Sequence, residues 1–271
     1  MLENILEKIE SLPPLPQTIE EIEIFRKKKD KEVEELTTII EKDALVITTL
    51  LKTANSSLFG FRSKVESIGR VINLLGINFT VYVTISETIN NLLSTDLTPY
   101  KIKSEDFINA STASSNLVNL WVGKIDNEIK DEILLASILQ ETGKFVLSEL
   151  IISRGLLEEF TKRLESGMDV VDAERELLKI TTSQVTAEIF KYWKLSDELI
   201  NVIEFVDDIN NCKSEYKQKA QYLDVIKTAC NASSLLSEKS IEKALKKAAF
   251  YKFDIELLKN AIEILQNRLS D

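Results

Sequence analysis

Residues 39–76, which read IIEKDALVITTLLKTANSSLFGFRSKVESIGRVINLLG, decide the fold class of this chain. Apolar residues recur at helical spacing, as at Ile47, Leu50 and Leu51, and no clean alternation of period two bounded by turn dipeptides interrupts them. The stretch therefore predicts a helix that ends near Asn55, a tight loop, and a second helix.

The same periodicity runs through the rest of the 271-residue chain, and 44% of its residues are apolar. Several pairs have the spacing of a capping box, among them Ser63 with Glu66 and Thr181 with Gln184. With only 7 glycines and 4 prolines, few turns are available to break the helices. We expect an all-α, multi-helix protein.

The composition excludes several classes of function. The net charge of −10 (34 basic minus 44 acidic residues) opposes general nucleic-acid binding. Cys212 and Cys230 cannot form a zinc site by themselves and are expected to be reduced thiols of a cytoplasmic protein. The chain has no histidine, so it has no Ser-His-Asp triad, no imidazole base and no imidazole metal ligand.

Membrane insertion is not expected. The most apolar stretch, residues 71–93, is interrupted by Asn73, Asn78, Thr84 and Glu87, which is typical of a buried core helix rather than a membrane span. The acidic N-terminus lacks the basic start and apolar core of a signal peptide.

A set of short motifs in fixed order resembles the HDOD domain, a bacterial signalling module related to the HD and HD-GYP phosphohydrolases. The motifs are LPPLP at residues 12–16, ANS at residues 54–56 and LLG at residues 74–76. The resemblance extends from about residue 12 to residue 208. It implies an HDOD domain over residues 1–208, with an N-terminal helical half (1–97) and an HD-like helical bundle (101–208), followed by a C-terminal helical extension (209–271) packed on the domain.

The chain departs from this pattern where HD enzymes bind metal. Residues 135–147, LASILQETGKFVL, resemble the stretch that carries the His-Asp pair of the superfamily, but the pair is replaced by Gln140 and Glu141. The upstream histidine of the superfamily falls near residue 109 or 110, which are Asn and Ala. The other vestigial positions are Thr182, Val206 and Asp207.

We therefore expect no catalytic residue, no metal ligand set and no cofactor. One alternative stays open: Glu141, Asp207 and Asp208 could hold a hard cation if they converged.

The leading hypothesis is a non-catalytic signal-transduction or regulatory module that acts by binding a protein partner. The first alternative is a sensor that binds a nucleotide or cyclic dinucleotide without cleaving it, which requires Lys144 or Arg70 to offset the acidic residues. The second is a residual metal-dependent phosphohydrolase. The residues proposed for binding are Asn55, Ser56, Phe59, Phe61 and Lys144, although Asn55 could instead cap a helix end.

Overall fold

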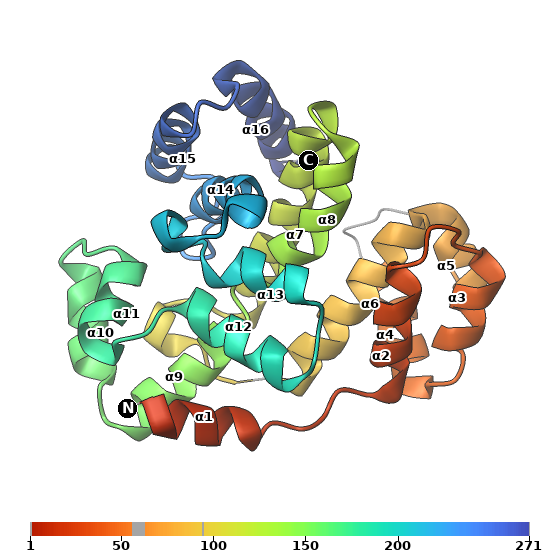
Figure 1. The fold of residues 1–271 in the computed structure, drawn as a ribbon, viewed down its shortest axis with the longest axis horizontal. Coiled ribbons are helices and arrows are strands. Elements are labelled where there is room, and N and C mark those ends of the chain that lie inside the picture. The colour runs from red at the N-terminus through yellow and green to blue at the C-terminus, as the bar shows by residue number, and fades with distance from the viewer. Residues whose placement is uncertain (1, 56–62, 94, 271) are drawn as a thin grey trace. The chain divides into compact units, whose positions relative to one another are not determined.

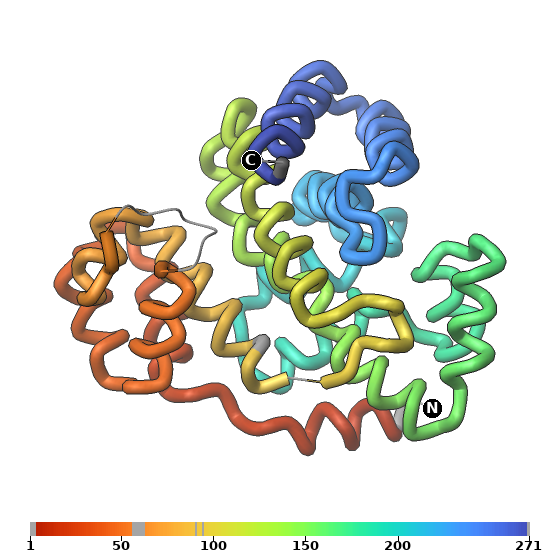
Figure 2. The backbone as a smooth tube through the Cα atoms, turned by 180° about the vertical axis from the view of Figure 1, so that it is seen from behind, coloured from red at the N-terminus to blue at the C-terminus, as the bar shows by residue number. Residues whose placement is uncertain are grey.

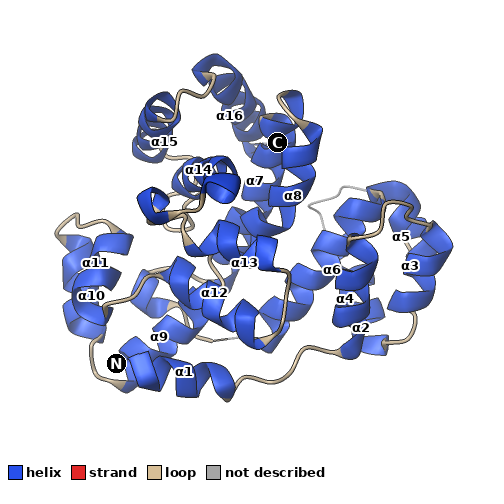
Figure 3. Cartoon of the chain, in the orientation of Figure 1, coloured by secondary structure: helices blue, strands red, loops and turns tan. Residues whose placement is uncertain are grey.

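The computed structural model describes residues 2–55, 63–93 and 95–270, and these ranges contain helices and connecting loops but no strand (Figures 1 and 3). The prediction of an all-α protein is confirmed. Ser56, Phe59 and Phe61, which the sequence offered as binding residues, lie outside the described residues.

The chain divides into two compact units. Unit 1 comprises residues 1–12 and 95–271, and unit 2 comprises residues 13–94. The division near residue 95 lies close to the boundary expected at residues 97–101. The structure differs from the expectation in placing the first twelve residues, which contain α1, in unit 1 rather than in the N-terminal half.

Unit 2 is a small bundle in which α6 packs against α2, α4 and α5, while α3 packs against α2 and α5. Its core contains fully buried aliphatic side chains such as Ile22, Leu36, Leu50 and Ile85. The bounds of its helices are α2 (Gln17–Arg26), α3 (Val33–Ile40), α4 (Ala44–Ala54), α5 (Ile68–Leu75) and α6 (Ile77–Leu92).

Asn55 follows α4 and has a structural role. Its side-chain Nδ2 donates to the carbonyl oxygens of Leu51 (2.7 Å) and Val65 (2.8 Å), and its Oδ1 accepts from the Val65 backbone N–H (2.8 Å). These bonds satisfy the helix end and tie it to the segment before α5. The predicted capping box at Ser63 and Glu66 is wrong, because the N-cap of α5 is Ser67.

The apolar stretch at residues 71–93 is broken at Gly76, which has a φ of +81° and separates α5 from α6. A positive φ of this kind favours glycine because the residue has no Cβ. No single helix in the described ranges is long and apolar enough to cross a membrane. Ile68–Leu75 and Ile77–Ile89 meet the length and composition criteria only as a pair, which is bent by 116°.

Unit 1 contains the remaining helices, and Figure 2 follows their path. The Thr181–Gln184 capping box is confirmed at the start of α12. α1 packs against α9 and α12, and the hydroxyl of Tyr192 donates to the Glu10 carbonyl at 3.1 Å. The bounds are α1 (Leu2–Glu10), η1 (Thr98–Tyr100), α7 (Ser104–Leu120), η2 (Val122–Lys124), α8 (Asn127–Leu139), α9 (Gly143–Ser153), α10 (Leu157–Glu165), α11 (Val170–Leu178), α12 (Thr182–Tyr192), α13 (Asp197–Glu204), η3 (Ile209–Asn211), α14 (Ser214–Ala229), α15 (Glu238–Phe250) and α16 (Ile255–Ser270).

The C-terminal helices share a core with the rest of unit 1. α14 packs against α7, α8 and α13, and α16 packs against α7. Trp121 at the end of α7 lies 5.1 Å from Tyr222 of α14, and the Tyr222 ring stacks on Phe253 at 4.1 Å between centroids. This aromatic cluster buries α14 deeply enough for its polar side chains to reach the interior of the unit.

Candidate functional site

The positions that the family resemblance marks as former ligands lie close together in unit 1. Glu141 lies between α8 and α9, Thr182 begins α12 and Asp207 follows α13, and all three line one polar pocket. Ala110 on α7 borders a much smaller cavity beside it, of about 10 Å³, which is about the volume that one water needs. Of the two residues near the expected upstream position, Asn109 is exposed and Ala110 is buried.

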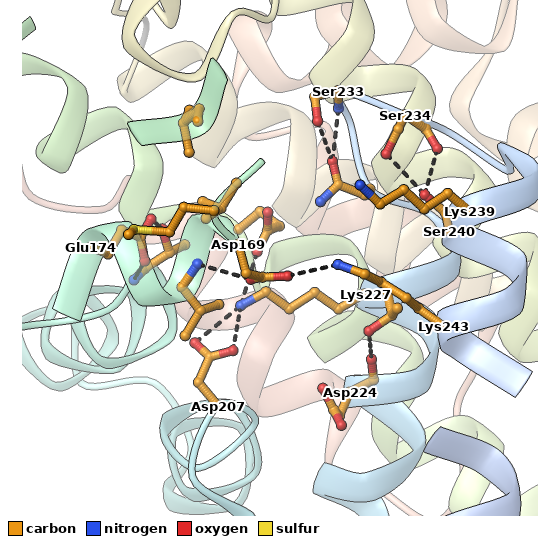
Figure 4. A pocket seen from close by; sticks show the side chains of 18 of the residues that line it. Asp169, Glu174, Asp207, Asp224, Lys227, Ser233, Ser234, Lys239, Ser240 and Lys243 are labelled. Carbon is orange, nitrogen blue, oxygen red and sulfur yellow. Dashed lines mark hydrogen bonds and ion pairs between the residues drawn. The ribbon is translucent and has the colours of Figure 1, made fainter. Parts of the chain in front are cut away.

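A lysine from the C-terminal helices occupies the centre of this group. The Nζ of Lys227, on α14, lies 2.9 and 3.1 Å from the two carboxylate oxygens of Asp207, 2.9 Å from Ser183 Oγ and 3.3 Å from Glu141 Oε1. Figure 4 shows its side chain extending from α14 to Asp207. Only 11% of the Lys227 side chain and 5% of the Asp207 side chain are exposed. The pair is a buried salt bridge, not a solvated one.

The pKa values of this pair follow from their mutual attraction. Burial acts to raise the pKa of Asp207, but the Lys227 ammonium outweighs burial and lowers that pKa to about 2. Burial acts to lower the pKa of Lys227, whereas Asp207, followed by Glu141, raises it well above its ordinary value. Both side chains are therefore charged at neutral pH.

Lys144, the residue expected near the vestigial cleft, belongs to the same network. Its ammonium forms an ion pair with Glu141 and lies 5.0 Å from the centroid of the Tyr100 ring, within range of a cation–π interaction. Burial acts to raise the pKa of Glu141, but Lys144 and then Lys227 lower it below its ordinary value. The sensor hypothesis required either Lys144 or Arg70 to compensate the negative charge of the acidic residues. Lys144 does so for Glu141. Arg70 belongs to unit 2.

Glu174 on α11 is a third carboxylate of the network, fully buried. It accepts hydrogen bonds from the Thr182 backbone N–H (2.7 Å), the Thr182 hydroxyl (2.5 Å) and the Tyr100 hydroxyl (2.9 Å). Burial raises its pKa, partly opposed by Lys144 and Lys227. Thr182, which the resemblance marks as a vestigial position, therefore serves as a hydrogen-bond donor to this acid.

Gly143, at the start of α9, has a packing role. A Cβ at this position would lie 2.3 Å from the Thr182 carbonyl oxygen and 2.9 Å from the Thr186 nitrogen. The Gly143 N–H donates to Thr186 Oγ1 at 2.8 Å, and that hydroxyl contacts the Gln140 carbonyl at 3.2 Å. The glycine allows α9 and α12 to approach closely, which is a packing requirement independent of metal.

Two of the former ligand positions lie outside the ion-pair network. Val206 is buried and has no polar group. Gln140 is buried, with Nε2 3.4 Å from the Ser137 carbonyl, and its Oε1 has no hydrogen-bond partner among the described residues.

The residues present do not fit a metal ion. Glu141 and Asp207 converge, as the carboxylate alternative required, but the Lys227 ammonium lies between them. Asp208 instead accepts a hydrogen bond from Asn211. A divalent cation bound by both carboxylates would lie close to the Lys227 ammonium. Coulomb repulsion between the two positive charges is strong in a buried site and opposes such binding. Within the described ranges, no three His, Cys, Asp or Glu side chains are arranged to hold a metal.

Sequence reasoning missed Lys227, Glu174 and Tyr100. Each is distant in the sequence from the motif that it completes. A signal was nevertheless present: Lys227 lies between the buried residues Ile226 and Ala229, and Glu174 follows the buried Ala173. Charged residues inside an apolar stripe are rarely buried unless they are paired.

Comparisons with known proteins agree with this fold. The chain resembles the solved structure of an HDOD domain protein of unknown function from Geobacter sulfurreducens, with a TM-score of 0.71, 15% identity and coverage of 100% of this chain and 98% of that one. A candidate signal transduction protein from Marinobacter aquaeolei VT8 gives a TM-score of 0.75 at 19% identity, covering 98% of this chain and 58% of that one. A candidate phosphohydrolase from Shewanella amazonensis SB2B gives a TM-score of 0.70 at 18% identity, and the match covers 97% of this chain and 94% of that one.

A curated relative is an uncharacterized protein of Treponema pallidum (strain Nichols), 22% identical over 219 residues. The match covers 79% of this chain but only 41% of that protein. The family model for the HDOD domain matches residues 12–209, well over half of the chain. The chain therefore belongs to the HDOD domain family.

Proposed function

We propose that this chain is a non-catalytic regulatory module of a cytoplasmic bacterial signalling pathway, and that it acts by binding a protein partner. The observation that carries the non-catalytic part is the position of Lys227. Its ammonium joins Asp207 and Glu141 at the point where an HD enzyme would need a metal. The chain has no histidine, and the Lys227 ammonium opposes a divalent cation at this point, so the metal-activated water of an HD enzyme has no support here.

The surface of unit 1 supports the interaction part of the proposal. A module that binds a protein partner is expected to expose apolar side chains. Phe250, the last residue of α15, is 80% exposed, which makes it the most exposed large apolar side chain in the described ranges. Tyr251 lies beside it with 5.5 Å between ring centroids. Exposed aromatic side chains of this kind are enriched at protein interfaces.

The non-catalytic part is tested by assaying the purified chain with bis(p-nitrophenyl) phosphate in the presence of Mg²⁺, Mn²⁺ or Fe²⁺. We expect no release of p-nitrophenol above the buffer rate with any of the metals. Turnover by the wild type that is abolished by Glu141→Ala would overturn the proposal and favour a residual phosphohydrolase.

The interaction part is tested by crosslinked affinity capture from native cells, comparing the wild type with Phe250→Asp and Phe250→Leu. We expect a reproducible partner that is retained by the Leu variant, which stays apolar, and lost by the Asp variant. A partner captured equally by both variants would place the interface elsewhere. Phe59→Asp and Phe61→Asp then test the segment that the sequence favoured.

A further inference from the structure

A polar pocket of about 280 Å³ opens beside the Lys227 cluster. Its deep end is lined by Glu141, Thr182, Asp207 and Lys227. Its outer part lies between the start of α11, the loop after α14 and one face of α15. This volume is near the lower end of small-molecule sites, roughly 300 Å³.

The side of the pocket formed by α15 is basic although the chain as a whole is acidic. Residues 237–252 contain five lysines and two glutamates, within a chain of net charge −10. Lys239, Lys243 and Lys247 line the pocket at intervals of four residues, which places them on one helix face. Figure 4 shows the side chains of Lys227, Lys239 and Lys243 extending in the same direction into the pocket.

Most of the charges that line the pocket are already paired. Lys243 lies 3.2 Å from Asp169, and Lys247 lies 2.5 Å from Asp224, which also accepts a hydrogen bond from the Tyr251 hydroxyl at 2.6 Å. In the outer part of the pocket, three lysines therefore face two aspartates. The unbalanced charge is positive.

Lys239 is the lysine without a counterion. No described residue forms an ion pair or a hydrogen bond with its ammonium. Nearby, the Asn231 Oδ1 accepts from the Ser233 N–H (2.9 Å) and hydroxyl (2.7 Å), and its Nδ2 has no acceptor in the part of the chain that the structure describes. The pocket thus holds a free cation and a free amide donor.

The Asp169–Lys243 pair can give way to an added anion. Both side chains are 49% exposed, and ion pairs this exposed contribute little to stability. Lys243 can therefore turn from Asp169 to an anion between itself and Lys239 at little cost. Asp169 keeps a hydrogen bond from the Val171 N–H as the N-cap of α11.

We propose that this pocket binds a phosphate group, free or as a small phosphate ester, through Lys239 and Lys243 and the Asn231 amide, without hydrolysing it. The proposal goes beyond the function given above, because it adds a small ligand to a module defined by its protein partner. Of the three deep acids, Asp207 and Glu141 are paired with Lys227 and Lys144. Glu174 accepts hydrogen bonds from Thr182 and Tyr100, and burial raises its pKa. The excess of positive charge is therefore confined to the outer part of the pocket, where the phosphate is placed. Bound phosphate would replace Asp169 as the partner of Lys243.

The test is isothermal titration of the full chain with inorganic phosphate at fixed ionic strength set with sodium chloride. Lys239→Ala should weaken binding about tenfold, the effect of one charge-assisted hydrogen bond, and Lys239→Arg should retain most of it. The control is Lys246→Ala on the same helix, because Lys246 is 74% exposed, lines no part of the pocket and pairs with Glu242. Lys239→Ala should leave the melting temperature unchanged.

A second titration with AMP distinguishes the two sources of phosphate. Tighter binding of AMP that is also weakened by Lys239→Ala would assign the pocket to an ester, and tighter binding of inorganic phosphate would assign it to the free oxyanion. Absence of saturable binding for both ligands would overturn the proposal. An equal loss of affinity in Lys239→Ala and Lys246→Ala would also overturn it, since it would indicate non-specific attraction to a basic helix.

Discussion

The ammonium of Lys227 lies 2.9 Å from Asp207 and 3.3 Å from Glu141, so a residue of α14 joins two buried acids of the polar pocket in unit 1. α14 lies beyond the stretch matched by the family model, which ends at residue 209. The C-terminal helices therefore supply the positive charge that stabilises acids within the HDOD domain. They complete the interior of unit 1 instead of merely covering its surface.

Replacing Lys227 with Met is expected to destabilise the chain by about 3–5 kcal/mol, because Asp207 would be left buried without a counterion. The measurement is the free energy of unfolding in urea at pH 7. Lys246→Met is the control, since its exposed ion pair with Glu242 should contribute no more than about 0.5 kcal/mol. Equal losses of unfolding free energy in the two variants would mean that the buried Lys227–Asp207 pair stabilises the chain no more than an exposed ion pair does.

The stability of the chain should fall in acid through Asp207. Its folded-state pKa is about 2 against an ordinary value of 3.8, so its contribution is present above pH 3.8 and is lost as the pH falls towards 2. The loss amounts to about 2 kcal/mol. The measurement is the difference in unfolding free energy between wild type and Asp207→Asn from pH 6 to pH 2, which should shrink over that window. A difference independent of pH would contradict the assignment.

Thr182→Val removes one hydrogen bond to the buried Glu174 while keeping the shape of the side chain. We expect a loss of about 1.5–3 kcal/mol, the range for hydrogen bonds to charged groups. Thr48→Val is the matched control, because the exposed Thr48 hydroxyl bonds only to the Ala44 carbonyl of its own helix. Urea unfolding of the two variants gives the comparison. A loss no larger than that of the control would show that Glu174 relies on its other donors.

Gly143→Ala should be strongly destabilising, by about 3 kcal/mol or more, because the new Cβ would lie 2.3 Å from the backbone oxygen of Thr182. Gly69→Ala provides the contrast, since no atom lies within 4 Å of a Cβ at that position of α5. It should be neutral or stabilising by up to about 1 kcal/mol. Thermal melts of both variants test the close approach of α9 and α12. Similar melting temperatures would argue against it.

Much of the fold could be predicted from the sequence because its causes are local. Helical periodicity identifies the helices, and the Thr181–Gln184 spacing locates the start of α12. Prediction was weaker where two local signals competed. Ser63 and Ser67 both have the character of an N-cap, and in the structure Ser67 caps α5, where its hydroxyl accepts a hydrogen bond from the Arg70 N–H.

The sequence by itself determined the family and the absence of histidine. Both are properties of residue type and order, and no tertiary contact is needed to establish them. Only the tertiary structure decided which residues surround Glu141 and Asp207. Lys227 and Glu174 come from α14 and α11, far from the motif in sequence. Burial and charge pairing depend on which helices pack together, and packing is a property of the whole unit rather than of any one segment.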